Sequence, residues 1–330
     1  MGDNPETSVI VINMNGLQFL EACFSALGRQ TYTDFETLLV DNGSTDRSIE
    51  FVKENFPHVI VVALDRNFGF GGGNNKGILA ARGKYIALLN NDTKVEPNWL
   101  TELIHGITSD PKVAMCASKL VFADNPGIVD SAGDEMAWFG QTFTYRYYPA
   151  EHPDVIRPRR CFSACAGAAL YRREVLDELG LFDDLYGLGY YEDVDLGFRA
   201  QMRGYECLYV PTAIVRHKVS GSMRRNRGRY IFFNQRNIEY LLLVNYPLAM
   251  LVGCLPSHLL YMTGSFLAHL IRGEGVPYFL AKIEVLRTLP AVLRKRSEIQ
   301  KKRRVSAREL RKKFFKGWFR HKLAFVSRKR

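Results

Sequence analysis

The sequence predicts an α/β fold in which buried strands alternate with helices. Short apolar runs of strand length recur four times before residue 92, and the first three lead into longer stretches with helical spacing of apolar side chains. Strands that alternate with helices at this spacing form a parallel sheet joined by right-handed crossovers. The 330 residues are enough for one large domain and an appendage.

The first half of the chain contains the most regular elements. We expect strands at 8–13, 37–40, 59–64 and 84–90. The helices between them are expected at 17–27, after the N-cap residues of segment 44–46, and up to residue 82. A glycine-rich segment, 67–75, is expected to form a loop before the third helix.

The alternation of strand and helix signals is less regular in the second half of the sequence. Residues 113–122 favour two short strands, and residues 123–160 are aromatic, proline-containing and irregular. The remaining elements are a strand at 166–171, helices at 173–179 and 191–202, and a strand at 206–210 that leads through Pro211 to His217.

The composition is that of a globular protein, with 47% hydrophobic and 24% charged residues, but the charge is uneven. Residues 282–330 contain 19 Lys or Arg and 3 Asp or Glu, a net charge of +16. The rest of the chain therefore carries −5 of the total +11. A basic tail of this kind suits nucleic acid or an anionic membrane surface, and a solvated helix is the alternative.

Cysteine usage and the N-terminus indicate a reducing compartment. The six cysteines are scattered and form no CxxC pair, which argues against structural zinc and against a disulfide framework. The first seven residues are polar and acidic, unlike a secretory signal. We therefore expect the protein in the cytoplasm.

A long uncharged stretch indicates contact with a membrane. The 32 residues between Glu239 and Arg272 include no Asp, Glu, Lys or Arg, and 248–271 is nearly long enough to span a bilayer. Prolines and histidines dilute this stretch, and basic residues flank both ends, so the positive-inside rule assigns no orientation. A pair of helices that lies on one leaflet or dips into it fits best, and a buried helical hairpin is the alternative.

Polar side chains follow each of the first four predicted strands. They are Asn13 and Asn15, Asp41 and Asn42, the segment from Asn67 through Gly69 to Asn74, and Asn90, Asn91 and Asp92. The carboxyl ends of parallel strands meet at one edge of a sheet, where ligands bind. Amide and carboxylate groups at this edge can recognise a base and a ribose. Glycine lets the backbone approach a bound ligand closely. Asp92 can hold a divalent cation that bridges the phosphates of a nucleotide. Ordinary strand-end turns are the alternative.

The second half adds two further groups of candidate residues. Glu192 and Asp193 stand side by side at the start of a predicted helix. Acidic residues are stabilised at the start of a helix, and Asp195 can pair with Arg199 four residues later, so these effects explain some of the acids in this segment. Two adjacent carboxylates are also expected in a site where one of them must accept a proton. His217 follows a strand and could be a second metal ligand or an ordinary core or surface histidine.

Five motifs resemble family 2 glycosyltransferases of the GT-A fold, over about residues 8–217. They are VIVINMNG, LLVDNGSTD, RNFGFGGGNNKG, YIALLNND and YYEDVDLGFR, in that order. Neither a GxGxxG motif after the first strand nor a GxxxxGK[ST] motif is present, which excludes the dinucleotide fingerprint and the P-loop. The resemblance implies a Rossmann-like mixed sheet, a nucleotide-diphosphosugar donor, inversion at the anomeric carbon, and Mg or Mn on the donor diphosphate.

The resemblance also implies residue roles on the donor side. Asp41 would contact the base, with Asn13 and Asn42 nearby, and Asn67 with the following glycine-rich segment would line the nucleotide site. Asn91 and Asp92 stand where the family has a metal-binding Asp-x-Asp motif. Asn90 replaces the first acid of that motif, so Asp92 would be the direct ligand and His217 would complete the coordination sphere.

On the acceptor side, the resemblance makes Asp193 the general base and Glu192 its support. The motif variants are similar to the rhamnosyltransferase branch of bacterial surface-polysaccharide enzymes, which implies dTDP-rhamnose as donor. Arg224, Arg225 and Arg236 could grip the diphosphate of a lipid-linked acceptor, or could form a solvated basic loop near lipid headgroups.

These observations predict a catalytic domain at 1–237 and a membrane-associating region at 238–330. The catalytic domain would consist of a nucleotide-binding half at about 8–92 and an acceptor half at about 93–237. The expected function is glycosyl transfer to a lipid-linked or glycan acceptor at the cytoplasmic face of the membrane. A metal-dependent nucleotidyltransferase and an RNA-binding protein that acts through its basic, aromatic tail are the alternatives.

Overall fold

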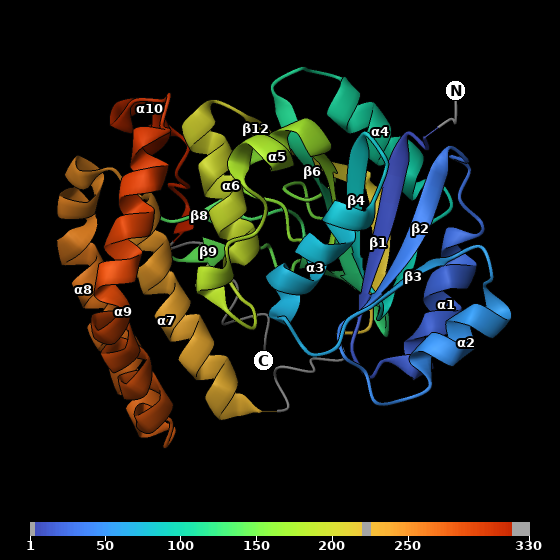
Figure 1. Cartoon of the computed structure of the whole chain (residues 1–330). Helices are drawn as coiled ribbons and strands as arrows, with labels where there is room; N and C mark the ends of the chain where they lie inside the picture. Colours follow the sequence, from blue (N-terminus) through green and yellow to red (C-terminus); the bar gives the residue numbers. More distant parts are fainter. Residues whose placement is uncertain (1–3, 220–225, 319–330) are drawn as a thin grey trace.

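A mixed β-sheet forms the centre of the computed structural model, which describes residues 4–219 and 226–318 (Figure 1). The first four strands of the sheet are β1 (Thr7–Asn13), β2 (Phe35–Asp41), β3 (Ile60–Ala63) and β4 (Tyr85–Asn90). They are parallel and lie in the order β3-β2-β1-β4. The sheet continues through β11 (Ala168–Arg172), β6 (Val113–Phe122), β12 (Glu206–His217) and β10 (Arg159–Cys161). Because β11 is antiparallel to both β4 and β6, the sheet is mixed.

Helices cover both faces of the sheet, as the apolar runs predict. The helices α1 (Leu17–Leu27), α2 (Ser48–Asn55) and α4 (Trp99–Thr108) share one hydrophobic core with the sheet. The helices α3 (Gly69–Ala80), α5 (Arg173–Leu179) and α6 (Glu192–Arg203) share the other. Side chains of β1 alternate between the two cores, with Val9 and Val11 in the first and Ile10 in the second.

The glycine-rich segment is a helix, so the prediction of a loop there is wrong. Helix α3 begins at Gly69, although glycine is a poor helix former. Packing against the sheet decides the structure: a Cβ atom on Gly77 would lie 2.7 Å from methyl groups of both Ile10 and Val40. The absence of side chains therefore lets α3 lie close to the sheet.

Two further segments differ from the predicted pattern. Residues 113–122 form one ten-residue strand, β6, in place of two short ones. Strand β12 does not end at residue 210 but continues past Pro211, with a shift in its pairing to β6 between Val210 and Ile214. This irregularity accommodates the proline and carries the chain on to His217.

The irregular segment 123–160 contains only short elements. Strand β7 (Asn125–Ser131) pairs with β6, and β8 (Glu135–Met136) pairs with β9 (Thr142–Phe143). Strand β5 (Thr93–Val95), which directly follows the fourth strand end, pairs with the last residues of β12.

The C-terminal region consists of α7 (Arg227–Asn245), α8 (Leu248–Ile271), α9 (Gly275–Lys301) and α10 (Ala307–Lys312). The boundary expected after residue 237 falls inside α7. A buried polar cluster connects three of these helices. The carboxylate of Glu239 in α7 contacts Lys282 of α9 at 2.5 Å and His258 of α8 at 2.9 Å. The other ring nitrogen of His258 lies 2.8 Å from the carbonyl oxygen of Phe139, which connects α8 to the segment between β8 and β9.

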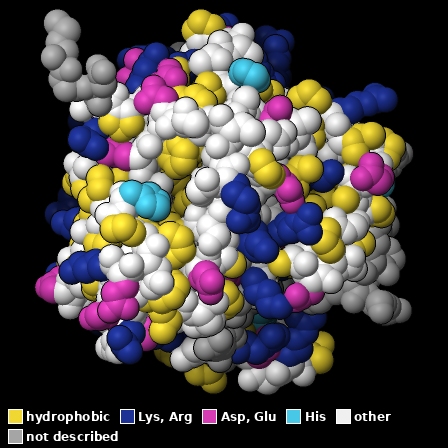
Figure 2. All heavy atoms as spheres, turned by 90° about the vertical axis from the view of Figure 1, so that its right-hand side faces the viewer, with side chains coloured by type: hydrophobic (Ala, Val, Ile, Leu, Met, Phe, Trp, Pro, Cys, Tyr) yellow, Lys and Arg dark blue, Asp and Glu magenta, His cyan; other side chains and the backbone are white. Residues whose placement is uncertain are grey.

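Helix α8 is the one helix among the described residues that is long and apolar enough to cross a membrane by length and composition, and only 17% of its most apolar window is buried. It lies at the outside of the molecule beside α9 (Figure 1). Its exposed side chains include Leu260 and Ile271, which are 77% and 86% exposed. The opposite side of the molecule mixes charged and apolar side chains and gathers Lys and Arg near its middle (Figure 2).

Candidate functional site

The polar residues at the first two strand ends form a hydrogen-bonded network. Asn13 and Asp41 are register partners at the ends of β1 and β2, and both are 1% exposed. Nδ2 of Asn13 donates to Oδ2 of Asp41 at 3.0 Å, while Oδ1 of Asn13 accepts from Nδ2 of Asn91 at 2.6 Å. Oδ1 of Asp41 accepts from the backbone N–H of Ser44 at 2.9 Å. The structure thus brings these predicted residues together in one fixed arrangement.

Two further predicted residues shape the backbone around this network. Asn42 donates to the carbonyl oxygen of Gly69 at 2.9 Å and accepts from the backbone N–H of Phe68 at 2.9 Å. Its Nδ2 also donates to Oδ1 of Asn67 at 3.1 Å. Asn15 adopts a left-handed φ of 51° and accepts from the backbone N–H of Thr45 at 2.7 Å. These side chains hold the turns that surround the strand ends.

Asn74 and Asn90 have more local surroundings. Asn74 is fully buried in α3 and donates to the carbonyl oxygen of Phe70 at 2.9 Å, so its side chain is turned into the helix packing. The burial follows from the helical conformation of the glycine-rich segment. Oδ1 of Asn74 has no hydrogen-bond partner among the described residues, and the ligand contact expected of Asn74 stays a prediction. Asn90 ends β4 and lies close to Gly167, at the start of the neighbouring β11.

A chain of charged side chains continues from Asp92. Nε2 of His217 lies 3.2 Å from Oδ1 of Asp92, and Nδ1 lies 2.7 Å from Oδ2 of Asp130. Asp130 in turn forms an ion pair with Arg146 at 2.9 Å. Burial opposes protonation of the ring, but the hydrogen bonds to the two carboxylates raise the pKa of His217 to about 9. Asp130 and Arg146 were not predicted because segment 123–160 has no regular pattern.

Asp92 and His217 are suitable ligands for a divalent cation. A carboxylate oxygen and an imidazole nitrogen face each other at 3.2 Å, so a cation that replaces the proton on Nε2 could contact both. Mn accepts both donor types, while Mg favours the carboxylate. Within residues 4–219 and 226–318, no group of three or more His, Cys, Asp and Glu side chains could hold a metal ion. A cation bound at this pair would therefore take further ligands from a substrate or water.

The adjacent carboxylates at the start of α6 have different surroundings. The two oxygens of Asp193 accept from the backbone N–H groups of Ala166 at 3.2 Å and Val194 at 2.8 Å. Burial raises the pKa of Asp193, and these backbone hydrogen bonds lower it. Oε2 of Glu192 is buried without a hydrogen-bond partner among the described residues. Burial and then the charge of Asp193 raise the pKa of Glu192 to about 8. Both adjacent carboxyl groups therefore hold their protons more tightly than they would in water.

A backbone contact joins the strand-end network to the start of α6. The backbone N–H of Phe70 donates to the carbonyl oxygen of Leu188 at 3.1 Å. A Cβ atom on Gly69, where φ is +77°, would lie only 2.4 Å from the carbonyl oxygen of Gly187. Glycine is therefore required where α3 meets the loop before Glu192.

Helix α7 supports this loop from the other side, which the sequence did not indicate. Asn237 is fully buried, and its Nδ2 lies 3.0 Å from the carbonyl oxygen of Tyr186, 3.0 Å from that of Gly189 and 2.7 Å from that of Tyr190. Arg236 is only 9% exposed and donates to the carbonyl oxygen of Tyr186 at 2.9 Å. Its position does not suit the acceptor contact expected of it, while Arg224 and Arg225 lie outside the described residues.

The fold is that of the GT-A class of nucleotide-sugar transferases. The structure of a mannosyltransferase from Pyrobaculum calidifontis, in complex with GDP-Man and Mn²⁺, superposes with a TM-score of 0.53 over 86% of this chain and 88% of that chain, at 18% identity. The sequence profile described as Glycosyl transferase family 2 matches residues 8–180. The chain belongs to this family, as the five motifs predicted.

Curated relatives are similar at low identity. The chain is 30% identical over 229 residues to the succinoglycan biosynthesis protein ExoO of Rhizobium meliloti, which covers 67% of this chain and 63% of that protein. It is 25% identical over 264 residues to the N-acetylglucosaminyl-diphospho-decaprenol L-rhamnosyltransferase of Mycobacterium tuberculosis, covering 69% of this chain and 84% of that protein. The chain spans only 28% of the length of another relative, an uncharacterised protein of Sinorhizobium fredii.

Proposed function

We propose that this chain is an inverting glycosyltransferase that moves a sugar from a nucleotide-diphosphosugar, with dTDP-rhamnose as the expected donor, to a lipid-linked or glycan acceptor in surface-polysaccharide assembly. The observation that carries the proposal is the backbone contact of Gly69 with Gly187, which brings the Asn13–Asp41 network and the Glu192–Asp193 pair onto one framework. Family membership favours glycosyl transfer over nucleotidyl transfer.

Asp193 is the general base in this proposal. Its carboxylate accepts the proton of the acceptor hydroxyl while the hydroxyl oxygen attacks the anomeric carbon, and the bond from that carbon to the donor phosphate breaks with inversion. Neutral Glu192 beside it limits the negative charge near the attacking oxygen. The backbone N–H groups of Ala166 and Val194 orient the base and offset part of the rise in its pKa that burial causes.

On the donor side, Asp41 and Asn13 would contact the nucleoside, and Asp92 with His217 would hold Mg or Mn. When bound, such a cation neutralises the charge that develops on the diphosphate leaving group. Asp130 holds the far nitrogen of the His217 ring, which fixes the direction in which Nε2 points.

Membrane contact is proposed for the C-terminal helices. The exposed apolar side chains of α8 can enter the acyl region of one leaflet while the basic residues of α9 and the tail meet anionic headgroups. The name of the mycobacterial relative specifies a decaprenyl-diphosphate-linked acceptor. A position on the inner face of the cell membrane would give the active site access to an acceptor of that chemical class.

The test is a panel of nucleotide sugars assayed for donor binding and for transfer with the purified protein. Asp193→Asn should lower transfer by about 100- to 10,000-fold, as expected for loss of a general base, and should leave donor binding intact. Asp177→Asn, which changes an exposed acid on the neighbouring α5, is the matched control.

Metal dependence is measured in the same assay. Asp92→Ala should weaken donor binding in the presence of Mn, and His217→Ala should do so to a smaller extent. Normal transfer by folded Asp193→Asn would remove that residue from the role of base. Full activity in excess EDTA would refute the metal assignment for Asp92 and His217.

A further inference from the structure

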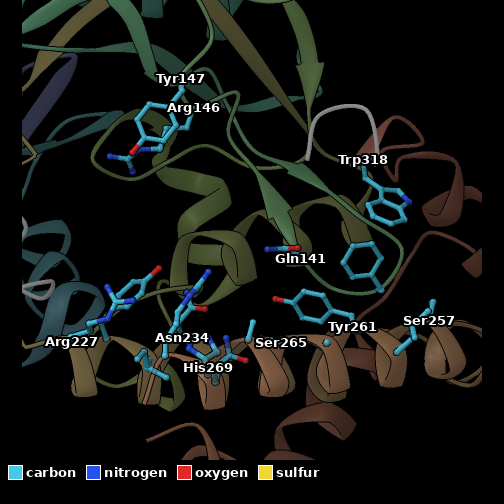
Figure 3. A pocket seen from close by; sticks show the side chains of 18 residues that line it. Gln141, Arg146, Tyr147, Arg227, Asn234, Ser257, Tyr261, Ser265, His269 and Trp318 are labelled. Carbon is cyan, nitrogen blue, oxygen red and sulfur yellow. The ribbon is translucent and has the colours of Figure 1, made fainter. Parts of the chain in front are cut away.

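A separate groove lies between the segment 139–147 and the helices α7 and α8 (Figure 3). Its volume is about 820 Å³, within the range of about 300–1,000 Å³ that is usual for small-molecule sites. Its α8 side is a single helical stripe with spacings of three and four residues. The stripe consists of Ser257, Leu260, Tyr261, Gly264, Ser265, Ala268 and His269, and Arg272 follows directly after the end of α8.

The groove has a cationic part and an apolar part. Arg146, Arg227 and Arg272 supply three guanidinium groups. Arg227 forms an ion pair with Glu274, whereas the Arg272 side chain has no hydrogen bond or ion pair to any residue in 4–219 or 226–318. The apolar part includes Leu260. A ligand that complements both parts combines a multiply charged anion with a hydrocarbon chain.

Unpartnered polar atoms also indicate a ligand in this groove. Oε1 of Gln141 and Oε1 of Gln235 are buried, and neither has a hydrogen-bond partner among the described residues. Gln235 is only 5% exposed, and both residues line the groove. Figure 3 shows Gln141 extended into the open space above α8. A buried amide oxygen without a partner is costly, so a hydroxyl or water donor is expected here.

The cationic part of the groove is connected to the candidate active site. Arg146 pairs with Asp130 at 2.9 Å, Asp130 contacts His217 at 2.7 Å, and His217 contacts Asp92 at 3.2 Å. The other wall of the groove is α8, whose remaining surface is exposed and apolar. A molecule seated here would have its charged end at the Arg146 end of this chain of contacts and its apolar end beside the proposed membrane surface.

We infer that this groove binds a polyisoprenoid diphosphate, with the diphosphate at the arginines and the first isoprene units along the α8 stripe. The inference rests on the proposed function. It specifies the chemical class of the acceptor and assigns the groove as the binding site of that acceptor. A free phosphate would use only the arginines, and a lipid without a diphosphate would use only the stripe. The groove offers both, and Tyr230 in its wall packs against Tyr190 of the loop before Glu192, with ring centroids 5.1 Å apart.

The experiment measures binding of farnesyl diphosphate to the full chain by calorimetry, with inorganic pyrophosphate as the comparison ligand. Gly264→Trp places an indole ring in the groove, and its Cβ starts in open space because no atom lies within 4 Å of a Cβ built there. It should weaken farnesyl diphosphate binding about tenfold or more, since displacing two methylene groups already has about that effect. Thr263→Trp places the same side chain at the adjacent, exposed position outside the groove and is the matched control.

Arg272→Ala tests the anionic part. It should weaken binding of both farnesyl diphosphate and pyrophosphate, because it removes a guanidinium that has no other partner among the described residues. Equal binding of farnesyl diphosphate by the parent chain and by both groove variants would overturn the inference, as would pyrophosphate binding as tight as that of farnesyl diphosphate. Binding of nucleotide sugar, measured on the same samples, is independent of the groove. If it persists, the proposed function survives the loss of this inference, and if it is absent, the proposed function fails on its own.

Discussion

Replacing Asn237 by alanine tests whether α7 is part of the catalytic framework. The Asn237 amide contacts three carbonyl oxygens of the loop before α6. The carbonyl of Tyr186 keeps a second donor in Arg236, so the substitution deprives chiefly those of Gly189 and Tyr190 of hydrogen bonds. An unsatisfied buried polar group costs about 1–3 kcal/mol. Two such groups predict a loss of about 2–6 kcal/mol in the free energy of unfolding, before any relaxation.

The effect on transfer should exceed what the lost stability explains. Tyr190 and Tyr191 hold left-handed φ values of 73° and 70° directly before Glu192, a strained conformation that α7 keeps in place. A displacement of about 1 Å at such a site costs about 100-fold in rate. We therefore expect Asn237→Ala to lose about 10- to 100-fold in turnover at a temperature where the variant is folded, with nucleotide binding retained.

Urea unfolding and single-turnover transfer are the two measurements for this variant. Asn55→Ala is the control, because that amide bonds only the Phe51 carbonyl of its own surface helix. Its stability and turnover should stay close to those of the parent chain. A stability loss below about 1 kcal/mol for Asn237→Ala, together with unchanged turnover, would refute the role assigned to α7.

Three further changes have defined outcomes. Burial raises the pKa of Glu192 from 4.5 to about 8 in the folded state, so the folded protein loses stability as the pH rises through that interval. Glutamine cannot ionise. Glu192→Gln should therefore unfold at a higher temperature than the parent protein at pH 9 and at a similar temperature at pH 4. Gly77→Val places methyl groups against Ile10 and Val40 and should destabilise the protein by about 1–3 kcal/mol in urea unfolding. A double Leu255→Glu, Leu259→Glu change on the exposed face of α8 should reduce flotation with anionic liposomes at high salt, and undiminished flotation would count against insertion of that face.

The sequence predicted the first four strands, and the meeting of the polar residues at their ends, because these signals are local. Each strand there is a short apolar run, and the polar residues that follow it must meet at one edge once the strands are parallel. The network of Asn13, Asp41 and Asn91 is a direct consequence. Local propensity failed at the glycine-rich segment, because the helix there is stabilised by close packing on the sheet and not by its own residues.

The support of the acceptor side could not be predicted in the same way. Asp130 meets His217, and Asn237 meets the loop at 186–190, across 87 and about 50 positions of sequence. Such contacts have no periodicity, so composition and spacing do not reveal them. Arg236 illustrates the opposite error: a basic residue near an apolar stretch suggested a surface role, but its guanidinium is buried against loop carbonyls.

The close backbone contact between Gly69 and Gly187 limits which segments of this chain can be exchanged with those of its relatives. A chimera that exchanges the first half at residue 92 must keep glycine at position 69, because even one methyl group there would meet the carbonyl oxygen of Gly187 at 2.4 Å. The first half can therefore be exchanged between relatives only together with the turn that precedes Glu192. For protein engineers, the unit of exchange is a pair of distant segments and not a contiguous half.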